Sequence, residues 1–254
     1  MPNVVAYHRP QSIDEALALL NRPQATQVLG GGSQLVPSLV GDPTEVVDLQ
    51  SLGLRSICAE GGRLVVGAMV TFADLAACEQ LPLGARELAK REAPSTIRTL
   101  ATVGGLIASA DSDSELLAAL LLLDGAVTVA ASSGERTLAL GSLLTTRVAP
   151  GEIIMHITVD PTKTIVSERT VRTGMDRAIV AVVGALGADG AVTLAATGMS
   201  GTPVVFDDPA KLVPLSDFRG SSAYRSQLAT VLTARVRATI TNASQLVIGP
   251  KGLS

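Results

Sequence analysis

The chain has few aromatic residues, few cysteines and no excess of positive charge. Phe, Trp and Tyr make up 2% of its 254 residues, so the interior must be built from aliphatic side chains, and few rings exist on which a ligand could stack. Cys58 and Cys78 are too few for a disulfide framework, a zinc site or an iron–sulfur cluster. The net charge of −3 and the lack of a basic run argue against nucleic acid as a partner.

Long apolar runs are also missing. The longest lies at residues 116–123 and is much shorter than the about 20 residues of a membrane-spanning helix, so it predicts a buried helix instead. The first residues, MPNVVAYHRPQS, have neither the charged segment nor the apolar core of a signal peptide. The sequence therefore predicts a cytoplasmic protein without a membrane span.

Two glycine turns are the most distinctive local patterns. One is a Thr-x-Gly-Gly turn at Thr102, Gly104 and Gly105, and the other lies within VLGGGSQLVP at residues 28–37, which reads as strand, turn and helix. Glycine lets the backbone approach a ligand closely and lets its N–H groups point at an anion. We therefore expect Gly31 and Gly104 to line one pocket, between an N-terminal α/β unit and the middle of the chain.

An acidic cluster follows the second turn. Asp111, Asp113 and Glu115 precede an apolar helix, where acidic residues favour the helix dipole and can also hold ligand hydroxyls. No basic residue or histidine lies next to them in the sequence, so a general acid–base pair is not expected. His8 and His156 lie in strand-like contexts and are expected to be structural.

Periodicity and turn residues divide the chain into three stretches. The first alternates strand and helix, which predicts parallel pairing, and Ser12 with Glu15 predicts a capping box at the start of its first helix. The middle stretch predicts antiparallel hairpins and a helix capped by Thr71. The last stretch predicts strands at residues 165–171, 178–186 and 192–197, a loop at 202–217 and a long amphipathic helix at 221–243.

Several segments occur in an order and spacing that are specific as a set. They are YHRP at residues 7–10, the first glycine turn with Pro37, VVDL at 46–49, LVVGAMVTFADL at 64–75, IRTLATVGG at 97–105 and DFRGSSAYRSQLATVL at 217–232. In this arrangement the chain resembles the FAD-binding medium subunit of molybdenum hydroxylases, the carbon monoxide dehydrogenase and xanthine dehydrogenase family. The resemblance covers nearly the whole length.

The resemblance implies an α+β fold. A two-part FAD-binding domain of the vanillyl-alcohol-oxidase-like type would be followed by a C-terminal three-stranded antiparallel sheet with helices. The three parts would be an N-terminal α/β FAD-binding subdomain at residues 1–53, an α+β FAD-binding subdomain at 54–163 and a sheet-and-helix domain at 164–254.

The resemblance also implies the residues that bind the cofactor. The family holds the FAD pyrophosphate through backbone N–H groups of the two glycine turns, here Gly30, Gly31, Gly32, Ser33 and Gln34 in the first and Thr102, Gly104 and Gly105 in the second. Ser109, Asp111 and Glu115 fall where the family places polar groups near the ribityl chain and ribose, and Ile153 or Ile154 would pack near the flavin. No catalytic side chain and no metal ligand are expected.

The implied function is electron transfer within an oxidoreductase complex. In the family, electrons pass from molybdopterin in a large subunit through two [2Fe–2S] clusters in a small subunit to FAD, and then to an external acceptor. Both partners would be separate chains. A homodimer is the expectation if the protein acts alone.

Two features keep other functions open. Leu106 stands where the family usually has Asn, Asp or Ser, and the basic positions ahead of Asp176 are altered. One alternative is a scaffold that has lost productive FAD binding and acts as a small-molecule binding protein or non-redox enzyme, and another is a purely structural subunit. Leu106 either points into the cleft, in which case Leu106→Asn should tighten FAD binding, or it faces the core.

Overall fold

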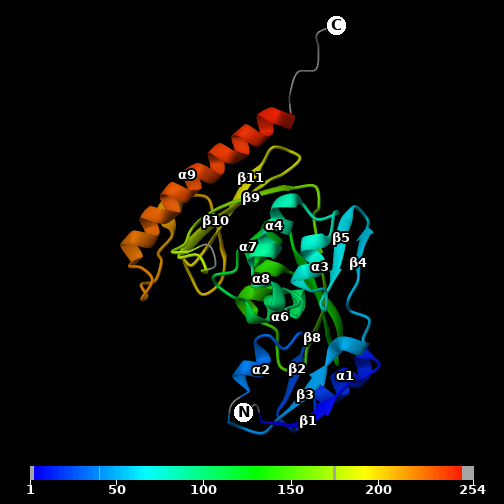
Figure 1. The fold of residues 1–254 in the computed structure, drawn as a ribbon. Helices are drawn as coiled ribbons and strands as arrows, with labels where there is room; N and C mark the ends of the chain where they lie inside the picture. The colour runs from blue at the N-terminus through cyan, green and yellow to red at the C-terminus, as the bar shows by residue number, and fades with distance from the viewer. Residues whose placement is uncertain (1–2, 40, 174–175, 248–254) are drawn as a thin grey trace. The chain divides into compact units, whose positions relative to one another are not determined.

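The computed structural model describes residues 3–39, 41–173 and 176–247 (Figure 1). Its internal contacts divide the chain into two compact units. The first consists of Met1–Leu81, Ala89–Ala110 and Asp124–Pro161, and the second of Pro82–Leu88, Asp111–Leu123 and Thr162–Ser254. Among the described residues, none of the helices combines the length and the apolar character that crossing a membrane requires.

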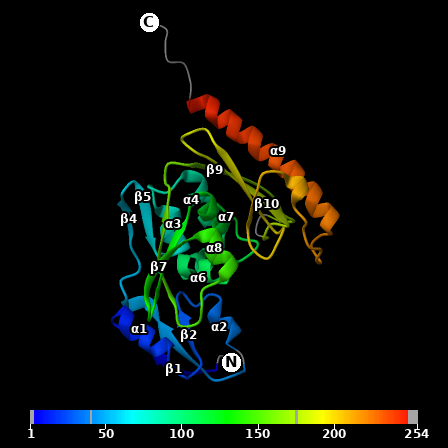
Figure 2. The same ribbon diagram turned by 180° about the vertical axis from the view of Figure 1, so that it is seen from behind.

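The first unit begins with a small parallel sheet. Its strands are β1 (Val4–His8), β2 (Thr26–Leu29) and β3 (Thr44–Asp48), in the order β1-β3-β2, accompanied by α1 (Ile13–Leu20), α2 (Leu35–Ser38) and the 3₁₀ helix η1 (Leu49–Ser51). Figure 2 shows α1 and α2 on opposite sides of this sheet. The hydroxyl of Ser12 caps α1 by accepting from the Glu15 N–H at 3.2 Å. The apolar face of this helix packs on Val47 and Leu49. The predicted parallel pairing is confirmed.

The rest of the first unit is built on a five-stranded antiparallel sheet of order β4-β5-β8-β6-β7. Its strands are β4 (Ile57–Glu60), β5 (Arg63–Gly67), β6 (Ala126–Ala131), β7 (Gly134–Ala139) and β8 (Ile153–Val159). The helices are α3 (Phe72–Ala77), α5 (Ser95–Arg98), α6 (Val103–Ser109) and α8 (Leu140–Thr146), while α4 (Leu83–Arg91) crosses the boundary between the units. Thr71 and Asp74 form a capping box at the start of α3, which confirms the predicted cap.

The second unit contains a four-stranded antiparallel sheet of order β12-β11-β10-β9. The strands are β9 (Thr164–Thr170), β10 (Val180–Leu186), β11 (Val192–Thr197) and β12 (Val204–Phe206), accompanied by α7 (Glu115–Leu122), η2 (Pro209–Lys211) and α9 (Ser222–Val247). Strand β10 contacts both α7 and α9, and nearly all its residues are buried, as expected for a strand covered on both faces. The predicted C-terminal antiparallel sheet is confirmed, but it gains the short strand β12 inside the segment predicted as a loop.

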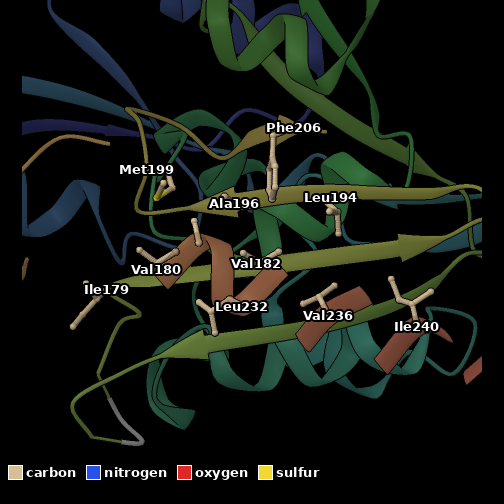
Figure 3. Packing of buried hydrophobic residues seen from close by; sticks show 11 residues of the cluster. Ile179, Val180, Val182, Leu194, Ala196, Met199, Phe206, Leu232, Val236 and Ile240 are labelled. Atoms are coloured by element: carbon tan, nitrogen blue, oxygen red, sulfur yellow. The ribbon is translucent and has the colours of Figure 1, made fainter. Parts of the chain in front are cut away.

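One face of this sheet and α9 enclose an apolar core. Figure 3 shows Val180 and Val182 of β10 and Leu194 of β11 together with Leu232 and Val236 of α9. Helix α7 is buried on nearly every side, because its sequence ELLAALLL leaves no polar face. Its contacts group α7 with the second unit, and the three-part division at residues 53 and 163 stays a prediction.

Candidate functional site

The first unit contains a cavity of about 500 Å³, a volume in the range of small-molecule sites. Residues from three segments that are distant in sequence line it. They are Gln27, Val28 and Gly30 at the end of β2, Thr102, Gly104 and Gly105 at the start of α6, and residues 148–152 after α8. Ala68, Met69 and Ile154 add apolar wall. The two glycine turns therefore meet at one cavity.

The first glycine turn keeps its backbone donors free. Strand β2 ends at Leu29, and α2 begins only at Leu35, so the turn lies outside regular hydrogen bonding. Within residues 3–39, 41–173 and 176–247, the N–H groups of Gly31, Gly32 and Ser33 find no acceptor. Unpaired N–H groups in a turn beside a cavity are suited to binding an anionic oxygen.

The second glycine turn has a different chemistry. Thr102 caps α6, and its Oγ1 accepts from the Gly105 N–H at 3.2 Å, while the Gly104 N–H donates to the Ala68 carbonyl at 2.8 Å. Both N–H groups are thus already hydrogen-bonded within the chain. This corrects the expectation that Gly104 and Gly105 offer their N–H groups to a phosphate, because the Ala68 carbonyl after β5 and the capping side chain of Thr102 accept them first.

The space that a side chain would need differs between the glycines of the two turns. A Cβ on Gly31 would lie 1.6 Å from the Leu100 carbonyl oxygen, and one on Gly104 would lie 2.9 Å from the Ala68 Cβ. A Cβ on Gly105 would meet only the Thr102 Oγ1, at 3.2 Å. Gly31 and Gly104 are therefore required for close packing, whereas Gly105 is exposed and its absent side chain leaves space at the cavity wall.

Gly31 is not among the residues that line the cavity, contrary to the expectation, although its neighbour Gly30 is; the Leu100 carbonyl lies against Gly31 where a Cβ would be. Three other residues implied by the resemblance, Gly32, Ser33 and Gln34, belong to the same turn but are not part of the lining. Whether they contact a ligand stays a prediction.

Two more of the predicted residues, Ile153 and Ser109, belong to the first unit, and neither lines the cavity. Ile153 is 1% exposed and lies in the core with α1, whereas its neighbour Ile154 lines the cavity, as the alternation of a strand requires. Ser109 does not line the cavity, and its hydroxyl donates to the Leu106 carbonyl at 2.8 Å. A role for Ser109 in binding stays a prediction.

The acidic cluster belongs to the second unit and is paired there with arginines. Asp111 contacts Arg177 at 2.5 Å, Asp113 contacts Arg219 at 2.6 Å, and Glu115, which is 6% exposed, contacts Arg169 at 3.3 Å. The hydrogen bond to Asp113 raises the pKa of the Arg219 guanidinium. These arginines are distant in sequence, so the absence of a neighbouring basic residue did not mean that the acids lack basic partners. The proposed ligand contacts of Asp111 and Glu115 stay predictions.

Leu106 is a core residue of α6. It is 4% exposed and does not line the cavity. The structure thus supports the alternative in which Leu106 faces the core, and removes the side chain from the list of ligand contacts.

Sequence reasoning missed the wall formed by residues 148–152. Glu152 is its one ionisable side chain, and Arg136 contacts both carboxylate oxygens of Glu152 at 2.8 Å while the Ala149 N–H donates to one of them at 3.0 Å. The Pro150-Gly151 pair was a signal of a turn but not of a binding site, since such pairs are common at the ends of helices.

His8 has the structural role expected of it. Its Nε2 lies 2.8 Å from a carboxylate oxygen of Glu45 and 3.1 Å from Arg22 Nη2. The hydrogen bond with His8 is the main cause that lowers the pKa of Glu45, and Arg22 adds to it. Within the described part of the chain, no group of three His, Cys, Asp or Glu residues is placed to hold a metal ion.

The cavity fits a flavin dinucleotide. Such a ligand needs backbone donors for its phosphates, glycines where it lies close to the chain and an apolar wall for its ring, and the cavity walls or the adjoining turn provide all three. The fit rests on the chemistry of the lining and not on a bound group.

Comparison with known proteins agrees with this fit. Residues 3–162 match the family described as FAD binding domain in molybdopterin dehydrogenase. The carbon monoxide dehydrogenase medium chain of Afipia carboxidovorans is 28% identical over 92% of this chain and 96% of its own length. The 6-hydroxypseudooxynicotine dehydrogenase complex subunit alpha of Paenarthrobacter nicotinovorans is 33% identical over 58% of this chain and 54% of its own.

The fold has a counterpart among solved structures. A chain of the cyanide-inactivated Cu,Mo-CO dehydrogenase crystal structure superposes with a TM-score of 0.83 and 27% identity, covering 92% of this chain and 96% of that one. The predicted α+β fold is thereby confirmed. The chain belongs to the family of FAD binding domains in molybdopterin dehydrogenases, and it is an FAD-binding subunit of an oxidoreductase of the molybdenum hydroxylase type.

Proposed function

We propose that this chain carries FAD as the electron-transfer subunit between the iron–sulfur clusters of a partner and an external acceptor. The observation that carries the proposal is the cavity in the FAD-binding domain. The first glycine turn adjoins this cavity with unpaired N–H groups, and Gly105 forms part of its wall without a side chain. The relatives named as medium chain and complex subunit support a role inside a larger assembly.

The residues of the chain divide the task of holding FAD between them. The N–H groups of Gly31, Gly32 and Ser33 would bind the phosphates, and the side-chain-free surface at Gly105 would let the dinucleotide approach the backbone. Met69 and Ile154 would give the ring an apolar wall that excludes water. When bound, FAD supplies the redox chemistry, accepting electrons and releasing them.

No proton-transferring side chain is needed for this role. Among the described residues that line the cavity, Glu152 is the one carboxylate, and its charge is balanced by Arg136. Both carboxylate oxygens of Glu152 accept from Arg136, and one of them also accepts from the Ala149 N–H, so the side chain is already engaged within the chain. The chain would bind and orient the flavin and tune its environment electrostatically.

The partners we propose are a small subunit with [2Fe–2S] clusters and a large subunit with molybdopterin. In this arrangement the large subunit chooses the substrate, and this chain passes electrons outward. A homodimer is the expected assembly only if the chain works without them. As a subunit of such a complex, the chain would depend on reconstitution with both partners for activity.

Reduction of the flavin by the partner tests the proposal. The purified chain, loaded with FAD, should show flavin bands near about 370 and 450 nm, and the band near about 450 nm should bleach when the reduced small subunit is added without oxygen. The oxidised small subunit is the control and should cause no bleaching. Flavin that stays oxidised beside the reduced small subunit would contradict electron transfer, even if FAD binding holds.

A further inference from the structure

Arg147 has a backbone conformation that glycine normally occupies. It follows the last residue of α8 with φ 67° and ψ 164°, a region that side chains rarely populate because the Cβ is crowded there. Its N–H donates to the Leu143 carbonyl at 2.7 Å, which ends the helix and fixes the residue. Glycine would adopt this conformation without a crowded Cβ.

Arg147 does not itself line the cavity, but it adjoins residues that do. Val148, the next residue in the chain, lines the cavity, and the Arg147 Nη1 donates at 3.3 Å to the carbonyl of Ser109, whose neighbour Ala108 also lines it. Both the backbone and the side chain of Arg147 are therefore attached to the cavity wall. The residue is exposed, so the guanidinium is accessible from solvent.

The charge of Arg147 is not balanced by the chain. Within residues 3–39, 41–173 and 176–247, no carboxylate lies within ion-pair distance of it, and the long bond to Ser109 uses one of five N–H donors. The Glu152 charge in the cavity wall is already balanced by Arg136. The cavity edge thus holds one uncompensated positive charge.

A diphosphate is stabilised by such a charge. Backbone N–H groups of the first glycine turn bind phosphate oxygens as dipoles and leave the net negative charge uncompensated, whereas a guanidinium pairs with phosphate through charge-assisted hydrogen bonds. We propose that Arg147 is the cation that binds the diphosphate of FAD in this chain, an inference that rests on the proposed function. The bond from Arg147 Nη1 to the Ser109 carbonyl would keep the guanidinium next to Ala108 of the cavity wall.

The experiment compares FAD with riboflavin, which has the same ring and no phosphate. The variants are Arg147→Met, which removes the charge, and Arg147→Gly, which also relieves the backbone. Arg63→Met is a matched control, because Arg63 donates to the Asp124 and Thr158 carbonyls and does not line the cavity. Affinities are measured by fluorescence titration of apoprotein at low and high salt, and thermal melts report folding.

We expect Arg147→Met and Arg147→Gly to bind FAD at least about tenfold more weakly than wild type at low salt, with a flatter salt dependence and unchanged riboflavin affinity. Arg147→Gly should melt no lower than wild type, because glycine accepts this conformation. Equal FAD affinity in wild type and both variants would overturn the inference and leave the proposed function intact. An equal loss for riboflavin would also overturn it, since the residue would then act on the shape of the cavity. Wild type that binds no FAD would overturn both.

Discussion

Gly104 and Gly105 are adjacent, yet the structure gives them different roles. Alanine at position 104 should lower the stability of the protein, whereas alanine at position 105 should weaken FAD binding. In Gly104→Ala the new Cβ would lie 2.9 Å from the Ala68 Cβ and 3.0 Å from the Ala68 oxygen, in a place where backbone cannot easily yield. Overpacking of this kind costs about 1–3 kcal/mol. For a domain of this size that lowers the Tm by about 2–12 °C.

Gly105→Ala should leave stability unchanged or slightly raised. Alanine is favoured over glycine by up to about 1 kcal/mol within a helix, and the one close contact, 3.2 Å to Thr102 Oγ1, offsets part of that gain. The methyl group would instead occupy space at the cavity wall. If displacing the ligand costs about 1–3 kcal/mol, FAD affinity falls by about 5- to 150-fold.

Thermal melts of the apoproteins and FAD titrations of both variants test this pair. Gly104→Ala should melt lower than wild type, and Gly105→Ala should melt like wild type but bind FAD more weakly. If Gly105→Ala bound FAD with wild-type affinity while Gly104→Ala kept the wild-type Tm, the assignment of the two glycines would be refuted.

Two further predictions concern residues away from the cavity wall. Leu106→Asn should lower the free energy of unfolding by about 2–5 kcal/mol without tightening FAD binding, because it places a polar amide in the core. Denaturant unfolding and FAD titration check this. A stable variant with higher FAD affinity would contradict it. Glu45 has a pKa lowered chiefly by the hydrogen bond with His8, so its stabilising contribution should be complete above its unfolded pKa of about 4.3 and be lost as pH falls through the lower folded value. Melts of wild type and Glu45→Gln should therefore differ most above about pH 5 and converge near about pH 3, and a difference that grows on acidification would show the wrong sign.

The sequence predicted those parts of the fold that depend on neighbouring residues. The helix cap at Thr71 and the strand–turn–helix around the first glycine turn were recognisable because each depends on a few consecutive residues. The strand β12 was not, because its three residues pair only with β11 and their pattern resembles a loop. The cytoplasmic location stays a prediction.

The site was predictable in outline and not in its contacts. Both glycine turns were identified, but whether an N–H group is free depends on residues distant in the chain, as the bond from Gly104 to Ala68 shows. The same limit hid the partner of Asp113, since Arg219 lies 106 residues further along the chain. Spacing identifies which residue types are present, whereas tertiary packing decides which of their atoms remain available.

The central claim is that the cavity of the first unit binds FAD, and titration of apoprotein with FAD tests it most directly. Flavin fluorescence or calorimetry should show saturable binding of one FAD per chain, weaker in Gly105→Ala, with no comparable loss in a surface control such as Arg63→Met. Absence of saturable binding in the correctly folded wild-type chain would contradict the claim and would favour a family scaffold without productive FAD binding.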